Sequence, residues 1–245
     1  MAGSPAAPCI VETLFLDAGG VLVHPNWQRV SDTLARHGVV VLPGALAAAD
    51  VRARWQLDLP ENARATSDDA RNARYFDAVR EFGAVPASDA ADAAFAELRR
   101  YHAEHNLYEW VPPDVVPALT RLRSLGTRLV MVSNANGTLH AHMQRLGLAT
   151  HFDLMLDSQC EGVEKPDPEL FRRALARCGA AAETTVHVGD LYYVDVTGAR
   201  AAGIEAWLFD AGGLYRGVDC PRVTTLAELG DRMQALVAAS GAAAT

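Results

Sequence analysis

Four short segments of this 245-residue chain carry side chains that can act as a nucleophile, a metal ligand or a charge stabiliser. Each segment stands at or just after the end of a short apolar run. In chain order their polar residues are Asp17, Ser133 with Asn134, Lys165, and Asp190 with Asp195. Lys165 is the one lysine among 22 Lys and Arg residues, so a general need for positive charge does not explain it. A compact ammonium suits a site crowded with carboxylates and a phosphoryl group better than a planar guanidinium does.

The chemistry that these groups fit is phosphoryl transfer. A carboxylate such as that of Asp17 can attack phosphorus and form an aspartyl-phosphate. Its charge repels phosphate unless a hard cation bridges the two, and Mg²⁺ binds carboxylate and phosphate oxygens. Asp17 and Asp190 are therefore the predicted Mg²⁺ ligands. The Ser133 hydroxyl, backbone amides near Asn134 and the Lys165 ammonium are predicted to stabilise the phosphoryl oxygens.

Five short apolar runs are predicted to be the buried parallel strands that position these groups. They are Thr13–Leu16, Arg128–Ser133, Phe152–Leu156, Thr185–Val188 and Glu205–Phe209. Helical patterns alternate with them, at Asp114–Leu125 and from Asp167-Pro168-Glu169 to Gly179. This alternation predicts an α/β fold with a doubly wound, Rossmann-like parallel sheet.

The connection after the first strand is far too long for an ordinary crossover. Residues 24–110 are helical in pattern, with breaks at Pro43-Gly44, Pro60 and Gly83–Pro86. We expect an inserted α-helical cap subdomain over 24–110, acting as a lid over the C-terminal edge of the sheet, where open α/β sheets bind ligands. The α/β core then comprises residues 8–23 and 111–240, and residues 1–7 and 241–245 are expected to be disordered ends.

With these motifs in this order, the chain resembles the haloacid dehalogenase-like hydrolase superfamily, in the subgroup with a helical cap inserted after the first strand. The resemblance covers nearly the whole chain. It implies that Asp17 is the nucleophile, that the Ser133 hydroxyl binds phosphate and that Lys165 neutralises charge. It also implies that Asp17, the Gly19 carbonyl and Asp190 bind the metal. Asp195 would then orient Lys165 or a metal-bound water. Singly, each aspartate also suits a turn or a helix cap, but jointly they assemble a complete site.

Two glycines follow the predicted nucleophile, and one of them departs from the family's pattern. Gly19 and Gly20 let the backbone approach a metal and a phosphate closely, which makes Gly20 a predicted substrate-binding residue. Phosphatases of the family usually carry a second aspartate at the position of Gly19, where it protonates the leaving group. Either the substrate has a good leaving group, such as an anomeric, acyl or aryl phosphate, or His24 supplies the proton. A surface role for His24 at the hinge is the alternative.

Other activities of the superfamily fit the chain less well. A metal-independent dehalogenase has no need of Asp190, and a phosphonoacetaldehyde-type hydrolase needs a cap lysine that this chain lacks. The sequence therefore predicts a Mg²⁺-dependent phosphatase, a phosphoric monoester hydrolase. A catalytically weak relative that binds a phosphorylated ligand or a protein is the alternative, and its support is Gly19. Phosphotransfer to an acceptor other than water is a further alternative that the sequence does not separate from hydrolysis.

Candidates for reading the non-phosphate part of a substrate lie in the predicted cap. They are Trp27, Gln28, Arg29, Arg71, Arg74, Tyr75, Tyr108 and Trp110. For the aromatic residues the competing interpretation is packing within the cap. Another histidine, His187, lies within the fourth predicted strand and is interpreted as a packed core residue.

Composition limits the partners. The net charge of −8 and the lack of a basic cluster argue against nucleic acid, and no apolar run approaches the length of a membrane span. The four cysteines have no paired-ligand spacing, which is typical of reduced thiols in a cytoplasmic protein. The predicted partner is a small phosphorylated metabolite, and the sequence is silent on oligomeric state.

Overall fold

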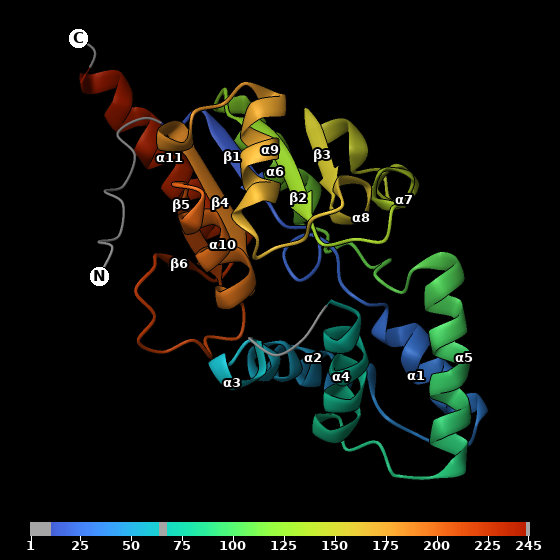
Figure 1. Ribbon diagram of the computed structural model, residues 1–245. Coiled ribbons are helices and arrows are strands. Elements are labelled where there is room, and N and C mark those ends of the chain that lie inside the picture. The colour runs from blue at the N-terminus through green and yellow to red at the C-terminus, as the bar shows by residue number, and fades with distance from the viewer. Residues whose placement is uncertain (1–10, 64–67, 244–245) are drawn as a thin grey trace. The chain divides into compact units, whose positions relative to one another are not determined.

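The structure, a computed structural model, describes residues 11–63 and 68–243 of the chain. The chain forms two compact units. One contains the described residues up to Leu22 together with those from Val111 onward, and the other is the continuous stretch Val23–Trp110. All strands of the sheet belong to the first unit, whereas the second consists of helices and the loops between them (Figure 1).

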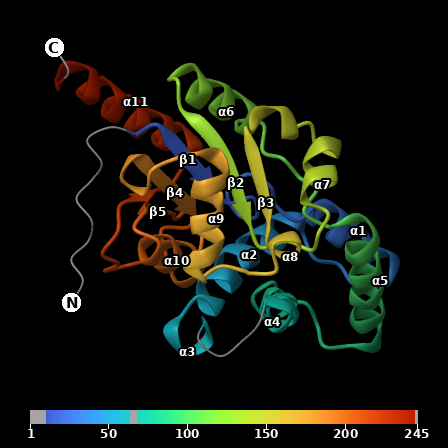
Figure 2. The same ribbon diagram turned by 45° about the horizontal axis from the view of Figure 1, so that its top comes forward.

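The first unit is built on a six-stranded parallel sheet with the order β3-β2-β1-β4-β5-β6 (Figures 1 and 2). Its strands are β1 (Thr13–Leu16), β2 (Arg128–Ser133), β3 (Leu154–Asp157), β4 (Thr185–Gly189), β5 (Glu205–Phe209) and β6 (Arg222–Val223). β1, β4 and β5 are buried along their whole length, as expected for parallel strands covered on both faces. The predicted α/β fold with a doubly wound parallel sheet is confirmed.

The sequence located the central strands more accurately than those at the edges. β1, β2 and β5 have the predicted bounds, and β4 extends one residue further, to Gly189. β3 begins at Leu154 and not at the predicted Phe152, because Phe152 closes a 3₁₀ turn by donating its N–H to the Ala149 carbonyl at 3.2 Å. β6 was not predicted, since it has only two residues at the edge of the sheet.

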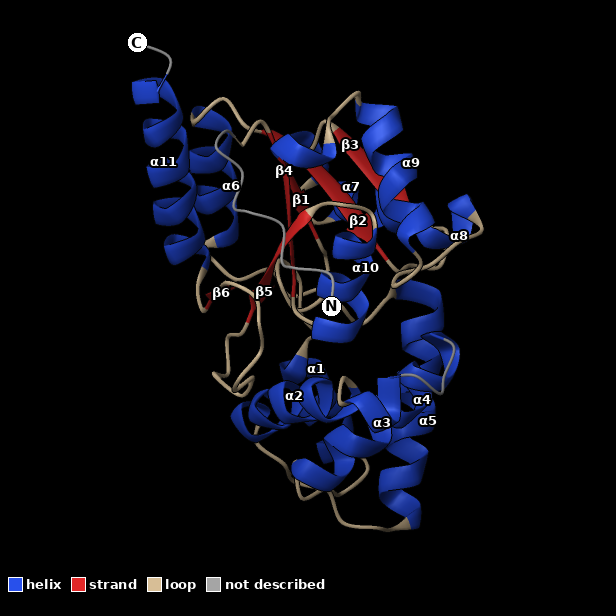
Figure 3. Cartoon of the chain, turned by 60° about the vertical axis from the view of Figure 1, so that its left-hand side comes forward, coloured by secondary structure: helices blue, strands red, loops and turns tan. Residues whose placement is uncertain are grey.

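Two helix pairs cover the sheet. α6 (Val115–Ser124) packs against α11 (Leu226–Ala243), and α9 (Pro168–Cys178) packs against α10 (Thr197–Ala201). The two pairs lie on opposite faces of the sheet (Figures 1 and 3). The shorter elements are α7 (Leu139–Arg145), α8 (Ser158–Glu161), η1 (Ala149–His151), η2 (Ala182–Thr184) and the π-helix η3 (Tyr192–Val196).

Helix α9 begins and ends where its sequence signals predict. The Asp167 side chain accepts the Glu169 N–H at 2.9 Å, and Pro168 takes the first helical position, where its missing N–H costs nothing. Gly179 ends the helix at φ 64°. At the chain end, α11 runs to Ala243 and so includes residues 241–243, for which the sequence predicted disorder, while residues 1–7 and 244–245 lie outside the described residues.

The second unit is the helical segment inserted between β1 and β2 that the sequence predicts. Its helices are α1 (Trp27–Arg36), α2 (Pro43–Leu57), α3 (Pro60–Ala63), α4 (Asp68–Phe82) and α5 (Asp89–His105). The predicted break at Gly83–Pro86 separates α4 from α5. The helices are also interrupted near the predicted breaks at Pro43-Gly44 and Pro60, but these residues do not lie between helices. Pro43 and Pro60 are the first residues of α2 and α3, a position that proline favours.

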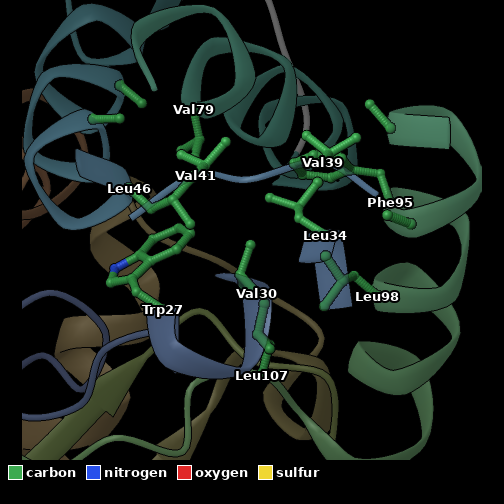
Figure 4. Close-up of a cluster of buried hydrophobic side chains, with 14 of the residues drawn as sticks. Trp27, Val30, Leu34, Val39, Val41, Leu46, Val79, Phe95, Leu98 and Leu107 are labelled. Atoms are coloured by element: carbon green, nitrogen blue, oxygen red, sulfur yellow. The ribbon is translucent and has the colours of Figure 1, made fainter. Parts of the chain in front are cut away.

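A hydrophobic cluster of its own holds the second unit together (Figure 4). Trp27, Val30 and Leu34 contribute from α1, and Leu46 contributes from α2. Side chains from α4, α5 and the connecting segments complete it, namely Val39, Val41, Val79, Phe95, Leu98 and Leu107. All of these labelled side chains are buried, so this unit has its own core.

No helix among residues 11–63 and 68–243 combines the length and the apolar character that crossing a membrane requires.

Two leucines of the second unit offer a matched test of this core. Leu46 is completely buried, whereas Leu42, four residues earlier, is 71% exposed. We expect Leu46→Ala to lower the free energy of unfolding by about 2–5 kcal/mol, through lost burial and a residual cavity. Leu42→Ala should change it by less than about 0.5 kcal/mol. Urea unfolding followed by tryptophan fluorescence measures both, and equal losses would contradict the described packing.

Candidate active site

The sheet topology brings the predicted site residues to one edge. Asp17 directly follows β1, Ser133 is the last residue of β2, and Asp190 directly follows β4. The backbone N–H of Asp17 donates to the Val188 carbonyl at 3.0 Å, which ties the end of β1 to β4. The chain runs outward from β1 to β3 on one side and from β4 to β6 on the other, so β1 and β4 flank the topological switch point. Open α/β sheets bind ligands at this place.

Lys165 joins this edge as a buried counter-ion. Its Nζ lies 2.8 Å from Asp17 Oδ1 and 2.6 Å from Asp195 Oδ1, and the residue is 1% exposed. A buried ammonium is costly unless carboxylates and hydrogen bonds replace its lost hydration. Asp17, Lys165 and Asp195 therefore form one ionic cluster whose members depend on one another.

The pKa values in this cluster move in different directions. Burial raises the pKa of Asp17; Lys165 opposes the rise and the charge of Asp195 adds to it. Burial would also raise the pKa of Asp195, but Lys165 and a hydrogen bond from His187 hold it well below its ordinary value. Against burial, the two carboxylates raise the pKa of Lys165 above its ordinary value. Pairing thus favours the charged forms of Lys165 and Asp195, whereas burial disfavours the charged form of Asp17.

Three buried carboxylates come close enough to share a cation. Asp17, Asp190 and Asp195 each offer one oxygen, and these oxygens lie within 4.8 Å of one another. Oxygen ligands of this kind suit Mg²⁺. Asp195 is already engaged by three donors: Oδ1 faces Lys165 Nζ and His187 Nε2, at 2.6 and 3.1 Å, and Oδ2 accepts the Leu191 N–H at 3.0 Å.

A π-helix and a glycine give Asp195 its position. The π-helix η3 begins just beyond Asp190 and Leu191, the two residues that follow β4, and the Asp195 N–H donates to the Leu191 carbonyl at 2.8 Å. The carboxylate lies where a side chain on Gly189 would have to be, since a Cβ built on Gly189 overlaps the Asp195 side chain. Only glycine at 189 leaves room for this arrangement. Short π-helical turns of this kind occur often at functional sites.

Asn134 holds the backbone of Lys165. Its Oδ1 accepts the Lys165 N–H at 2.8 Å, and its Nδ2 donates to the Lys165 carbonyl at 3.0 Å. Asn134 is a predicted substrate-binding residue, and this two-bond contact across 31 residues was not predicted. Ser133, beside it, is buried at the end of β2, as predicted for a residue at the edge of the sheet.

Asp157 is a residue of this edge that the sequence analysis missed. It ends β3, and its carboxylate accepts the N–H groups of Gly137, Leu139 and Gln159 at 3.0 to 3.1 Å. These bonds order the loop that follows Ser133. The sequence feature that could have identified Asp157 is its place directly after a predicted strand and before Ser158, which is typical of a helix cap.

Gly19 and Gly20 lie in a tight turn after Asp17. The Leu22 N–H donates to the Ala18 carbonyl at 2.9 Å and closes the turn. Gly20 has a φ of 80°, in the left-handed region where glycine carries no steric penalty. The nucleophile candidate is thus followed by a tight, largely buried turn of the backbone and by no second carboxylate.

His24 belongs to the second unit, at the point where the chain enters and leaves it. His24 and Trp110 exchange backbone hydrogen bonds of 2.9 and 3.1 Å, and their rings are 5.6 Å apart. Beside this pair, Glu109 binds Arg29 and Asn26, which fastens the entering chain to the leaving chain.

The other candidates in the predicted cap divide into packed and exposed residues. Trp27 is 7% exposed within the hydrophobic cluster, and the Tyr75 hydroxyl donates to buried Asp50 at 2.7 Å. Both therefore serve the interior of their unit. Tyr108 is half-buried beside Arg54, whereas Gln28, Arg74 and Trp110 are exposed. The side chain of Arg71 lies outside the described residues.

The close approach of Gly189 and Asp195 generates a testable prediction. We expect Gly189→Ala to lower the free energy of unfolding by about 1–3 kcal/mol, because the added methyl group must displace a fully buried carboxylate. Gly44→Ala is the control, since no atom lies within 4 Å of the added Cβ. The control should be neutral or stabilising by up to about 1 kcal/mol. Equal urea midpoints for Gly189→Ala and the parent protein would show that Asp195 lies elsewhere.

Comparison with known proteins shows the family of the chain. A model of the haloacid dehalogenase-like hydrolase family matches residues 11–203. A human protein, haloacid dehalogenase-like hydrolase domain-containing protein 3, is 31% identical over 190 residues, which cover 76% of each chain. A phosphoserine phosphatase of Thermus thermophilus is 40% identical over 56% of this chain and 53% of its own length. A glyceraldehyde 3-phosphate phosphatase of Methanopyrus kandleri is 35% identical over 54% and 56%. The matched region thus spans about half the length of these two phosphatases.

Solved structures share the fold at lower identity. The HAD hydrolase YfnB of Bacillus subtilis, solved with magnesium bound, has a TM-score of 0.64 at 19% identity, over 91% of this chain and 99% of its own. An L-2-haloacid dehalogenase has a TM-score of 0.61 at 20% identity, over 92% and 99%. The region matched by the family model contains the aspartates at the sheet edge and the single lysine, and the chain belongs to the haloacid dehalogenase-like hydrolase family.

Proposed function

We propose that the protein is a Mg²⁺-dependent phosphatase of small phosphorylated metabolites. The observation that carries this proposal is the buried ammonium of Lys165 between Asp17 and Asp195, beside a further carboxylate at Asp190. A carboxylate nucleophile needs such a positive charge when its target is an anionic phosphoryl group. A metal-independent dehalogenase would have no use for Asp190.

Each residue of the site then has a role in the reaction. An oxygen of Asp17 attacks phosphorus, the bond from phosphorus to the leaving oxygen breaks, and the phosphoryl group is carried on Asp17 until water releases it. The Lys165 ammonium and the Ser133 hydroxyl stabilise the charge on the phosphoryl oxygens. Asp195 keeps Lys165 charged and in place. Asn134 holds the Lys165 backbone, so its side chain supports the site.

The donor set fits Mg²⁺. Asp17 and Asp190 are the proposed side-chain ligands, with the Gly19 carbonyl as a third group, because the oxygens of Asp195 already accept three protein hydrogen bonds. When bound, Mg²⁺ supplies positive charge that offsets the repulsion between Asp17 and a phosphate. It also stabilises the ionised form of Asp17, whose pKa burial raises.

The substrate class follows from the relatives and from Gly19. The phosphatases of Thermus thermophilus and Methanopyrus kandleri are named for phosphoserine and glyceraldehyde 3-phosphate, both small phosphorylated metabolites. We propose a small metabolite here too, with a leaving group that needs little protonation, since Gly19 has no side chain to supply a proton. The helical insertion is proposed to act as the cap that selects the rest of the substrate, and Trp110, 49% exposed, is its candidate aromatic contact.

The first prediction concerns metal and nucleophile. Phosphate release from an aryl phosphate should require Mg²⁺ and stop when EDTA is added. Asp17→Asn should lower kcat by about a thousandfold or more, because it removes the covalent route. Asp114→Asn is the matched control, since Asp114 is exposed and makes no side-chain cap hydrogen bond. Mg²⁺ binding without turnover on any of a panel of phosphorylated metabolites would favour the binding-module alternative.

The second prediction concerns the leaving group. Without an acid at position 19, kcat/KM for glycerol phosphate should lie about a hundred- to ten-thousandfold below that for an anomeric or aryl phosphate. Comparable values would contradict this prediction and call for another acid. His24→Ala then tests the alternative, because removal of a real acid changes both turnover and its dependence on pH.

A further inference from the structure

His187 is a buried polar residue to which the proposed reaction gives no role. It lies in the middle of β4, between Phe15 of β1 and Ala206 of β5 in the sheet register, and it is completely buried. The ring of Phe171 from α9 packs against it at a centroid distance of 4.9 Å. The surroundings are those of a core position, where an apolar side chain would ordinarily stand.

One ring nitrogen of His187 is committed to the ionic cluster. Nε2 lies 3.1 Å from Asp195 Oδ1, the same oxygen that faces Lys165 Nζ at 2.6 Å. An ionised carboxylate only accepts hydrogen bonds, so His187 donates from Nε2. Nδ1 is buried, and no described protein group hydrogen-bonds to it. A leucine or phenylalanine would fill this position without burying a polar nitrogen, so packing alone does not account for the histidine.

The contact with Asp195 does account for it. The Asp195 carboxylate is held by Leu191 on one oxygen and by Lys165 and His187 on the other. Leu191 immediately precedes the π-helix, and Asp195 lies within it. Lys165 reaches Asp195 at the end of a flexible side chain. His187 is anchored in a central strand and has a stiff ring. Its hydrogen bond therefore restricts the rotation of the Asp195 carboxylate.

We propose that His187 is a positioning residue that, through Asp195, sets where the Lys165 ammonium stands relative to Asp17. The structural part of this proposal concerns only these contacts, whereas the expected effect of His187 on turnover rests on the proposed function. Loss of the Nε2 donor leaves the Asp195 carboxylate held by Leu191 and Lys165 alone, so that Lys165 is less well placed. A charge that is misplaced by a fraction of an ångström stabilises the transition state less while still attracting the substrate.

The single lysine makes the structural part directly measurable. Lysine labelled with ¹³C at Cε gives one methylene signal for the whole chain, from Lys165. At fixed pH, His187→Leu should shift this signal, and His187→Gln should return it toward the parent position, because a glutamine amide can donate from about the place of Nε2. Val186→Ala is the matched control, since it disturbs the packing of the same strand from its other face.

The kinetic arm uses the same variants on an aryl phosphate with Mg²⁺. His187→Leu should lower kcat by about 10- to 100-fold, the usual effect of removing a residue that orients a functional group, with KM nearly unchanged. His187→Gln should recover most of this loss, and the Leu variant should unfold at no lower temperature than the Gln variant. Should the Leu variant not fold, His187→Asn replaces it, because its shorter amide does not reach Asp195.

Each outcome decides one point. An unshifted lysine signal in His187→Leu, or an equal shift in Val186→Ala, overturns the positioning role. A shifted signal with unchanged kcat overturns the effect of His187 on turnover. If the parent protein releases no phosphate from any substrate, the proposed function fails, while the lysine signal still decides whether His187 positions Lys165.

Discussion

The site depends on one interaction, the burial of a single ammonium between two carboxylates. Removing Lys165, Asp17 and Asp195 from water costs several kcal/mol per charge, and only close, well-oriented pairing offsets that cost. Such a cluster stabilises the protein little in total, but the loss of one member leaves an uncompensated buried charge. The cluster holds a positive charge at a fixed place at the sheet edge, and in the proposed reaction this charge offsets the negative charge of the phosphoryl group.

The surrounding fold can be understood as a set of constraints on that charge. Parallel strands end at one edge, which brings Asp17 and Asp190 together from segments far apart in the chain. The missing side chain of Gly189 makes room for Asp195, and the π-helix after β4 turns Asp195 back toward Lys165. Asn134 fixes the Lys165 backbone from the neighbouring loop. Each of these contacts is small by itself, yet each restricts where the Lys165 ammonium can lie.

Residues that act through local pattern were predictable, and residues that act through distant contacts were not. β1, β2 and β5 are continuous apolar runs, and α9 has its cap, proline and terminal glycine in sequence, so their bounds follow from the chain itself. Lys165 stood out through composition. The contacts of Asn134 with Lys165 and of His187 with Asp195 span 31 and 8 residues and exist only once the sheet is assembled. The weakly patterned edge strand β6 escaped for a related reason, since two residues carry no periodicity.

Charge balance links the metal to the absence of a second aspartate in the turn. The site contains three carboxylates and one ammonium, so in fully ionised form it carries two excess negative charges before a substrate arrives. The proposed Mg²⁺ would balance that excess, and the phosphate of the proposed substrate would then add negative charge of its own. A carboxylate at position 19 would add a further negative charge as well as a proton donor. With glycine there, position 19 offers no proton donor, and the site holds less negative charge for the proposed cation and the lysine to offset. Such a trade suits a substrate whose leaving oxygen is already weakly basic, since the proton that is lost matters least for it.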